Sequence, residues 1–377
     1  MNRPRGVARC ALAVAVILGG TVLASSPASA SPSTEAAETA GVNGTVFATL
    51  QVEDRTYVAG SFTMAGDLPR NNAAVILADG TVGAWNPSTD NIVYALAASA
   101  DGSRIFLGGT FQTVGAAPDA VSRKRVAAVD ADSGAVVKDW RTPARGTVRA
   151  LASSGDRLYV GGGFSTIGGV ATSKLAALST STGEVDASFA PRPDATVRAL
   201  DVSPGGDRLY VAGGFKNIAG QSRPGAAELV SSTGAATGFA PTDGGVGLAL
   251  DVMPDGQRMF FSTTSNRTYA YDPATSNSPV YVIRTGGDVQ AIGATATEVY
   301  IGGHFDNLPQ LQLARIHLAS FLPADGAVTA WNPTVSGGSG KGVWSLTPTQ
   351  TALAVGGVFT RVNGEPQPGF ARFPFGP

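Results

Sequence analysis

The residues best suited to metal chemistry lie in the last third of the chain. His304 and His317 are the two histidines of the 377-residue sequence, and Asp306 lies between them. If adjacent antiparallel strands carried the histidines, these three side chains could hold an ion such as zinc. There is no third histidine, and the single cysteine, Cys10, lies in a segment typical of export signals. We therefore predict no metal site.

Two other segments resemble parts of ion and phosphate sites. Residues 130–134 read Asp-Ala-Asp-Ser-Gly, like the opening of a calcium loop in which alternating carboxylates and a glycine surround the ion. The equivalent residues 179–183 read Ser-Thr-Ser-Thr-Gly, so a tight turn is the simpler interpretation. The glycine-rich residues 337–342 lack the spacing of a phosphate-binding loop and the Ser or Thr after its lysine. We predict no cofactor.

Motifs of nucleophilic catalysis are also missing. The sequence has no Gly-x-Ser-x-Gly elbow and no His-Glu-x-x-His pair. The paired carboxylates of glycosidases come together only in the fold, so the sequence cannot mark them. We assign no catalytic residue, and an enzyme with carboxylates in a central funnel remains an alternative.

The elements that would position such residues come from one repeated unit. Its clearest part is a strand with paired small residues and a terminal aromatic, as in YVGGGF ending at Phe164. A degenerate copy, FFSTTS ending at Ser265, fills the one long gap. Steps of 40 to 54 residues separate seven copies. The other copies end at Phe62, Phe111, Phe215, Phe305 and Phe359.

Each copy contains four short apolar runs separated by turns, and no segment has a helical period. Four short strands repeated about every 50 residues are typical of a propeller blade. A β-solenoid has shorter coils, of roughly 20 to 30 residues. We predict an all-β protein with a single β-propeller of about seven four-stranded blades.

The N-terminal residues predict export. A basic start is followed by about fifteen apolar residues, too few to span a bilayer, and by the small-residue cleavage site Ala28-Ser29-Ala30. We assign residues 1–30 to a signal peptide, residues 31–44 to a flexible leader and residues 45–377 to the propeller. The seventh blade has either three strands and a stub at Phe375 or the leader as its fourth strand.

Removal of the signal peptide leaves 24 basic and 28 acidic residues and no cysteine. This acidic balance gives no reason to expect binding to nucleic acid or to an anionic membrane. The mature chain can form no intramolecular disulfide, so burial of apolar surface must stabilise it.

The copies resemble the secreted bacterial propellers that are built from delta-60-type repeats. The resemblance rests on LYVGGGF at residues 158–164, LYVAGGF at residues 209–215 and the later copies, and extends from Val46 to about Phe373. It implies the propeller fold. It supplies no catalytic residues for this chain.

Binding residues are expected in the longer loops that follow the second strand of each copy, because variable loops on a rigid scaffold commonly carry function. These loops hold Arg123, Arg125, Lys174 and Arg223, which we predict to bind an anionic partner. The sequence thus favours a secreted, non-enzymatic, monomeric protein that acts as a scaffold or binds an anionic cell-wall or extracellular polymer, or a protein partner. The alternative is a secreted enzyme that acts on polysaccharide or another extracellular polymer.

Overall fold

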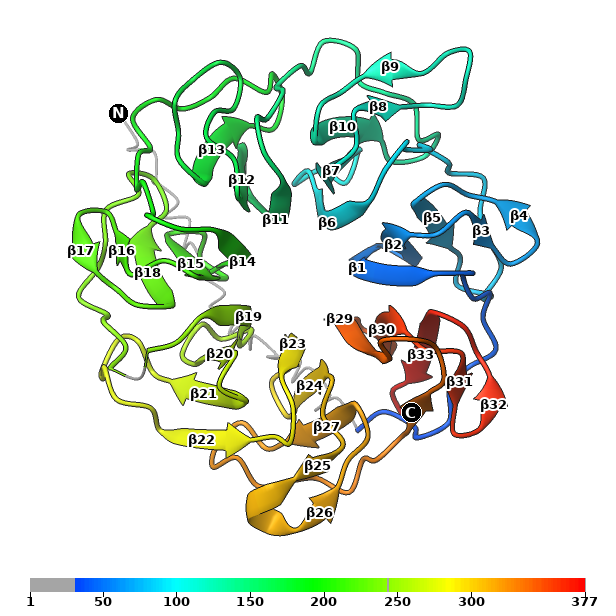
Figure 1. The fold of residues 1–377 in the computed structure, drawn as a ribbon, viewed down its shortest axis with the longest axis vertical. Helices are drawn as coiled ribbons and strands as arrows, with labels where there is room; N and C mark the ends of the chain where they lie inside the picture. Colours follow the sequence, from blue (N-terminus) through cyan, green and yellow to red (C-terminus); the bar gives the residue numbers. More distant parts are fainter. Residues whose placement is uncertain (1–30, 243, 377) are drawn as a thin grey trace, which may run out of the picture.

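The protein is a β-propeller in which seven blades form a ring (Figure 1), and side chains of their innermost strands line a central channel. The computed structural model describes residues 31–242 and 244–376, so the predicted signal peptide lies outside the described residues. Among the described residues, no helix is long and apolar enough to cross a membrane. The predicted fold class is confirmed.

Each blade contributes one innermost strand to the channel wall. The innermost strands are β1 (Thr45–Val52), β6 (Val93–Ala98), β11 (Val148–Ser154), β14 (Val197–Val202), β19 (Gly247–Val252), β23 (Val289–Ala294) and β29 (Gly342–Pro348). The second strands are β2 (Arg55–Ser61), β7 (Arg104–Gly109), β12 (Arg157–Gly162), β15 (Arg208–Gly213), β20 (Met259–Thr263), β24 (Val299–Gly303) and β30 (Ala352–Val358). The third strands are β5 (Ala73–Ile76), β10 (Val126–Asp130), β13 (Leu175–Ser179), β18 (Ala226–Val230), β21 (Arg267–Tyr271), β27 (Leu318–Phe321) and β33 (Phe370–Pro374).

The fourth strand is shorter than the sequence predicts. In five blades it is a single bridge to the third strand, such as Val129 with Val136. Among the described residues, a full fourth strand, β22 (Tyr281–Arg284), occurs in the fifth blade, which is built from the degenerate copy.

Short hairpins occupy the loops between second and third strands in five blades, where the sequence predicts longer, variable loops. They lie at the outer edge of the ring (Figure 1). The hairpin strands are β3 (Met64–Ala65), β4 (Leu68–Pro69), β8 (Thr113–Val114), β9 (Val121–Ser122), β16 (Asn217–Ile218), β17 (Gln221–Ser222), β25 (Asn307–Leu308), β26 (Leu313–Ala314), β31 (Arg361–Val362) and β32 (Glu365–Pro366). The 3-10 helix η1 (Pro309–Leu311) lies within one hairpin, and β28 (Val335–Ser336) pairs with β31.

The expectation of a flexible leader is corrected. Ala37 forms a bridge with Arg372 of β33, and the backbone N–H of Ser33 donates to Pro374 at 2.7 Å. Farther along, Ala40 donates to Gly80 of the first blade at 2.8 Å. The leader therefore covers the open edge of the seventh blade, and the second of our two closure alternatives holds. An uncovered edge would expose unpaired backbone groups.

The glycine pair of the repeat lets two backbones approach closely. A Cβ on Gly162 would lie 2.1 Å from the carbonyl oxygen of Thr147, the residue just before the neighbouring innermost strand. The first glycine of the pair, Gly161, faces the next blade, where a Cβ would lie 2.5 Å from a Val197 methyl group. Gly162 thus allows two backbone segments of one blade to approach closely, and Gly161 allows two neighbouring blades to pack closely.

Candidate functional site

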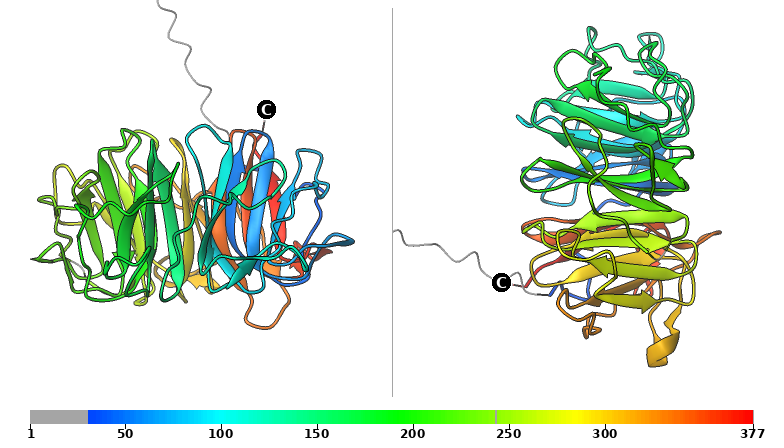
Figure 2. Two further views of the ribbon diagram at one scale, coloured as in Figure 1. Left: turned by 90° about the horizontal axis from the view of Figure 1, so that it is seen from above. Right: turned by 90° about the vertical axis from the view of Figure 1, so that its left-hand side faces the viewer.

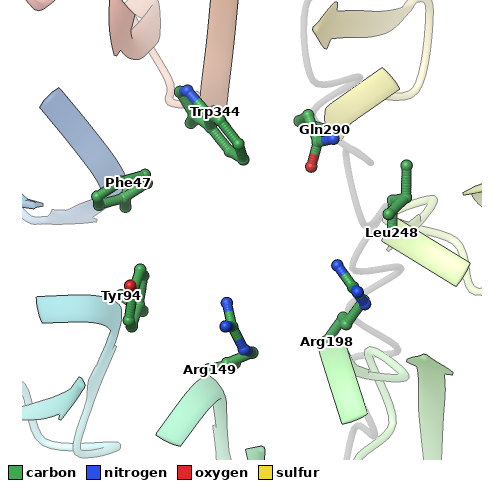
Figure 3. Close-up of a pocket in the computed structure, with 7 residues that line it drawn as sticks. All are labelled: Phe47, Tyr94, Arg149, Arg198, Leu248, Gln290 and Trp344. Carbon is green, nitrogen blue, oxygen red and sulfur yellow. The ribbon is translucent and has the colours of Figure 1, made fainter. Parts of the chain in front are cut away.

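Seven side chains, one from each innermost strand, form a ring in the central channel (Figure 3). They enclose a cavity of about 330 Å³. We call these residues the channel ring: Phe47, Tyr94, Arg149, Arg198, Leu248, Gln290 and Trp344.

A β-bulge near the start of each innermost strand accounts for the ring. In β1 the pairing with β2 shifts register between Val46 and Ala48, so Phe47 has no partner across the ladder. The same shift flanks Tyr94 in β6 and Arg149 in β11. A bulge commonly re-aims a side chain, and here the bulged residues point into the channel (Figure 3).

The ring positions differ between copies far more than their neighbours do. The preceding residue is valine in six copies and glycine in one, and the following residue is alanine in six copies and serine in one. Valine and alanine repeat because they pack against the same parts of each blade. The ring residue makes no such repeated contact, so packing does not fix its residue type, and the side chain can serve ligand recognition instead.

Aromatic side chains form one side of the channel ring. The centroid of the Phe47 ring lies 5.1 Å from that of Tyr94 and 5.4 Å from that of Trp344. The latter pair is edge-to-face, with an interplanar angle of 75°. The three neighbouring blades therefore present a continuous apolar wall that is partly exposed to the cavity.

Two arginines continue the ring beside this wall, and we call Arg149 and Arg198 the arginine pair. Neither forms an ion pair or a hydrogen bond with the described residues. The guanidinium carbon of Arg149 lies 5.1 Å from the ring centroid of Tyr94. Burial lowers the pKa of Arg198, and the charge of Arg149 lowers it further. Two unneutralised cations in one cavity favour an anionic ligand.

A second layer of contacts orients the remaining polar side of the ring. Gln290 Nε2 donates to Asp288 Oδ2 at 2.5 Å, and His304 Nδ1 lies 3.0 Å from Asp288 Oδ1. The His304 ring also packs edge-to-face on Trp344, with centroids 5.0 Å apart. The hydrogen bond from His304 lowers the pKa of Asp288. His304 thus supports two ring residues.

The other possible metal ligands do not gather around His304. His317 is buried with a φ of 65°, and burial lowers its pKa. The part of the chain that the structure describes contains no group of three metal-ligating side chains. Asp130 closes its own turn, because its Oδ1 accepts from the Ser133 hydroxyl at 2.6 Å and from the Ser133 backbone at 2.8 Å.

Two carboxyl groups lie in the channel wall beyond the ring. Asp201 accepts from the backbone of Val252 in the next blade at 3.0 Å, and Asp251 accepts from that of Ala294 at 2.6 Å. The two side chains are hydrogen-bonded to each other. Burial raises the pKa of both, and the charge of Asp201 raises that of Asp251 further. The pair therefore links three successive blades, and burial favours the protonated form of its carboxyl groups.

We expect Asp251→Asn to stabilise the protein at neutral and alkaline pH. A raised folded-state pKa means that stability is greatest in acid and falls as pH rises from the ordinary aspartate pKa, about 3.9, through the folded-state value. Asparagine keeps the acceptor for Ala294 and donates to Asp201 without ionising. Thermal melts from pH 4 to 9 should show a smaller decline for the variant. Identical pH profiles would contradict a raised pKa of Asp251.

The structure places the predicted ligand residues Arg123 and Arg223 against their own blades. Arg123 is buried, and it donates to the carbonyls of Ser122 at 2.9 Å and Lys138 at 2.8 Å. Arg223 makes the equivalent bond to Thr237 at 2.9 Å. Each guanidinium thus ties an outer hairpin to the fourth run of its blade. Arg70 and Arg315 make equivalent bonds.

Arg125 and Lys174 occupy a repeated left-handed position before the third strand, with φ of 70° and 67°. The backbone of each residue forms two hydrogen bonds, one to the second glycine of the repeat and one to the phenylalanine that follows the second strand. In Lys174 the carbonyl accepts from the N–H of Gly162, and the N–H donates to the carbonyl of Phe164. Arg125 Nη1 also donates to Ala144 at 3.0 Å. The four predicted ligand residues are therefore distributed over three blades, outside the channel ring.

Arg123→Ala should lower the free energy of unfolding by about 1.5–3 kcal/mol, because buried carbonyls lose a charged donor. The neighbouring Lys124 is exposed, so Lys124→Ala serves as the control and should change stability by less than about 0.5 kcal/mol. Urea denaturation of the two variants tests this. Equal stabilities would contradict the structural role of Arg123.

Comparisons with known proteins show the fold of this chain. No family model matches it, and no curated protein matches it. A solved structure described as RRP9 WD40 repeats is 12% identical, with a TM-score of 0.65, and the match covers 92% of this chain and 99% of that one. A structure of U3-55K is also 12% identical, with a TM-score of 0.62 and coverage of 89% and 96%. The chain is thus similar to WD40 β-propellers in architecture.

Proposed function

We propose that this protein is a secreted, non-enzymatic binding protein whose channel ring recognises an acidic saccharide of an extracellular or cell-wall polymer. The observation that carries the proposal is the arginine pair, which faces the cavity beside three aromatic side chains and has no anionic partner among the described residues. Export and the polymer are expectations from the sequence.

The chemistry of an acidic sugar complements both sides of the ring. A carboxylate can accept hydrogen bonds from a guanidinium in a bidentate geometry, which neutralises the arginine pair. The apolar face of a sugar ring can pack on Phe47, Tyr94 and Trp344. Gln290, held by Asp288, offers an amide for a hydroxyl group. A cavity of about 330 Å³ is at the lower end of small-molecule sites, which suits one sugar unit of a chain.

A polymer can reach the ring from one face of the propeller. The ring residues lie near the starts of the innermost strands, and these starts pair with the ends of the second strands, as Val46 does with Gly60. The loops after the second strands therefore surround the same face. The sequence predicts ligand binding on this same face, although in the outer loops.

Trp344 provides a direct signal for the test, since it is the tryptophan that lines the cavity, while Trp85, Trp140 and Trp331 are buried. Titration with oligogalacturonate should change tryptophan fluorescence saturably. The neutral galactose oligomer of equal length is the matched control and should bind at least about tenfold more weakly, and Trp344→Phe should remove most of the signal. Equal binding of the two oligomers, or none of either, would overturn the proposal.

The channel carboxyl groups do not favour the enzymatic alternative. Asp201 accepts from Val202 as well as from Val252, and Asp251 accepts from Ala294. The two groups also bond each other. These contacts occupy the oxygens that a general acid or base would present to a substrate, so the pair is better explained as a link between blades.

A further inference from the structure

Glu298 is a buried carboxylate that lacks a cationic partner. It precedes β24, and its residue is 5% exposed. Its Oε1 accepts a hydrogen bond from the Ser31 hydroxyl, while its Oε2 is buried with no hydrogen-bond partner. No Lys, Arg or His side chain of the described residues forms an ion pair with it. A buried charge without a partner is costly, so a missing cation is expected near Oε2.

A buried tyrosine lies close to Glu298. The neighbouring Tyr300 is fully buried, and its hydroxyl lies near Glu298 without forming a well-aligned hydrogen bond. Burial raises the pKa of Tyr300, and the charge of Glu298 raises it further. The tyrosine cannot neutralise the carboxylate, because it carries no positive charge in either protonation state.

The segment that begins at Ser31 is held firmly beside this carboxylate. Ser33 donates its backbone N–H to Pro374 at 2.7 Å and accepts from Trp331 Nε1 at 3.0 Å. Pro32 forms a bridge with Phe375. Both views of Figure 2 show the described chain starting next to its C-terminal end. The position of Ser31 is therefore set by the closure of the propeller.

Ser31 is also the residue that follows the predicted signal-peptide cleavage site. We propose that cleavage between Ala30 and Ser31 creates an α-ammonium group that forms an ion pair with the buried carboxylate of Glu298. Water supplies a hydroxyl group to the Ala30 carbonyl carbon and a proton to the Ser31 nitrogen. That nitrogen binds one further proton at neutral pH, since the pKa of a free α-amino group is about 7.7–8.0.

Covalent geometry makes this contact feasible. The α-nitrogen of a serine lies about 3 Å from its own hydroxyl oxygen, and the Ser31 hydroxyl already touches Glu298. Before cleavage the same nitrogen is an uncharged peptide N–H. Processing thus does more than release the protein, because it supplies a cation for the carboxylate of the sixth blade. This proposal rests on the predicted cleavage site and is independent of the proposed ligand.

The test compares two mature proteins that differ by one residue. One chain begins with a free amine at Ser31, and the other begins at Ala30, which displaces the charge by one residue. The chain that begins at Ser31 should melt roughly 3–8 °C higher. Acetylating its N-terminus should remove this gain. Equal melting temperatures of the two chains, or a gain that survives acetylation, would overturn the proposal.

Glu298→Gln in both chains shows whether the carboxylate is the partner. The difference in melting temperature between the two N-termini should vanish in this background. Glu35→Gln is the matched control, since Glu35 is exposed in the same leader, and it should leave the difference intact. If Glu298→Gln prevents folding, the acetylated and free chains with native Glu298 still decide the matter. A difference that persists in the Glu298→Gln background would overturn the assignment.

Discussion

Gly162→Ala is expected to destabilise the protein by about 3 kcal/mol or more, which is large for a single methyl group. The added Cβ would lie 2.1 Å from the carbonyl oxygen of Thr147 and 3.0 Å from the Cα of Val148. Both atoms belong to the backbone beside the β-bulge, so no side-chain rotation can relieve the contact. Overpacking of this kind commonly costs about 1–3 kcal/mol of stability. Because the neighbouring atoms belong to a rigid backbone, we expect the cost of Gly162→Ala to reach at least the upper end of this range.

Gly163→Ala provides the matched control one residue away. A Cβ at Gly163 would lie 3.6 Å from its nearest neighbour, the hydroxyl oxygen of Thr196. That distance is ordinary contact, and alanine restricts the unfolded chain more than glycine does, so stability should be unchanged or slightly higher. Urea denaturation of both variants measures the difference. A Gly162→Ala protein as stable as the control would show that the strands can separate without cost.

Arg149→Gln combined with Arg198→Gln is expected to weaken binding of oligogalacturonate roughly 100-fold, or about 2.7 kcal/mol. Both arginines lose their charge while keeping polar side chains. Their guanidinium groups make no contact with protein carbonyls or carboxylates among the described residues, so the melting temperature should hardly change.

The two single variants refine this prediction. If both arginines contact one carboxylate, the second substitution should cost less than the first, because a shared interaction can be lost only once. Strict additivity would indicate separate anionic groups on the ligand. Binding that is unchanged in both single variants and in the double variant would remove the arginine pair from the site.

The repeated parts of the fold could be predicted because they depend on local signals. The glycine pair, the turn glycines and the alternating apolar runs specify short strands wherever they occur. Even the degenerate copy at residues 260–265 forms a blade, since its apolar runs still face neighbouring blades. The fourth strand was overestimated, because an apolar run alone does not show how many ladder bonds will form.

Closure of the ring depends on contacts between the two ends of the chain. The leader is polar and without periodicity, which is typical of a flexible segment. Its order comes from β33, whose edge is open until Ala37 pairs with Arg372. No local feature of the leader encodes this partner, so the sequence left two alternatives.

The candidate site was missed for a different reason. The prediction of a site in the loops relied on the positive charge of the basic loop residues. In the structure, Arg123 and Arg223 donate to backbone carbonyls of their own blades. The signal for the channel ring was present in the repeats. A single variable position lies between a nearly constant valine and a nearly constant alanine, as Arg149 does between Val148 and Ala150. Only the bulge in the structure shows that this position faces the channel.

The central claim is that the channel ring binds the ligand and that the outer arginines maintain the blades. The most direct test compares oligogalacturonate affinity in two sets of variants by Trp344 fluorescence. The first carries Arg149→Gln and Arg198→Gln, and the second carries conservative replacements at the four outer positions, Arg123→Lys, Arg125→Lys, Lys174→Arg and Arg223→Lys. We predict a roughly 100-fold loss for the first set and less than about a threefold change for the second. The reverse pattern, with the loss confined to the outer set, would contradict the account.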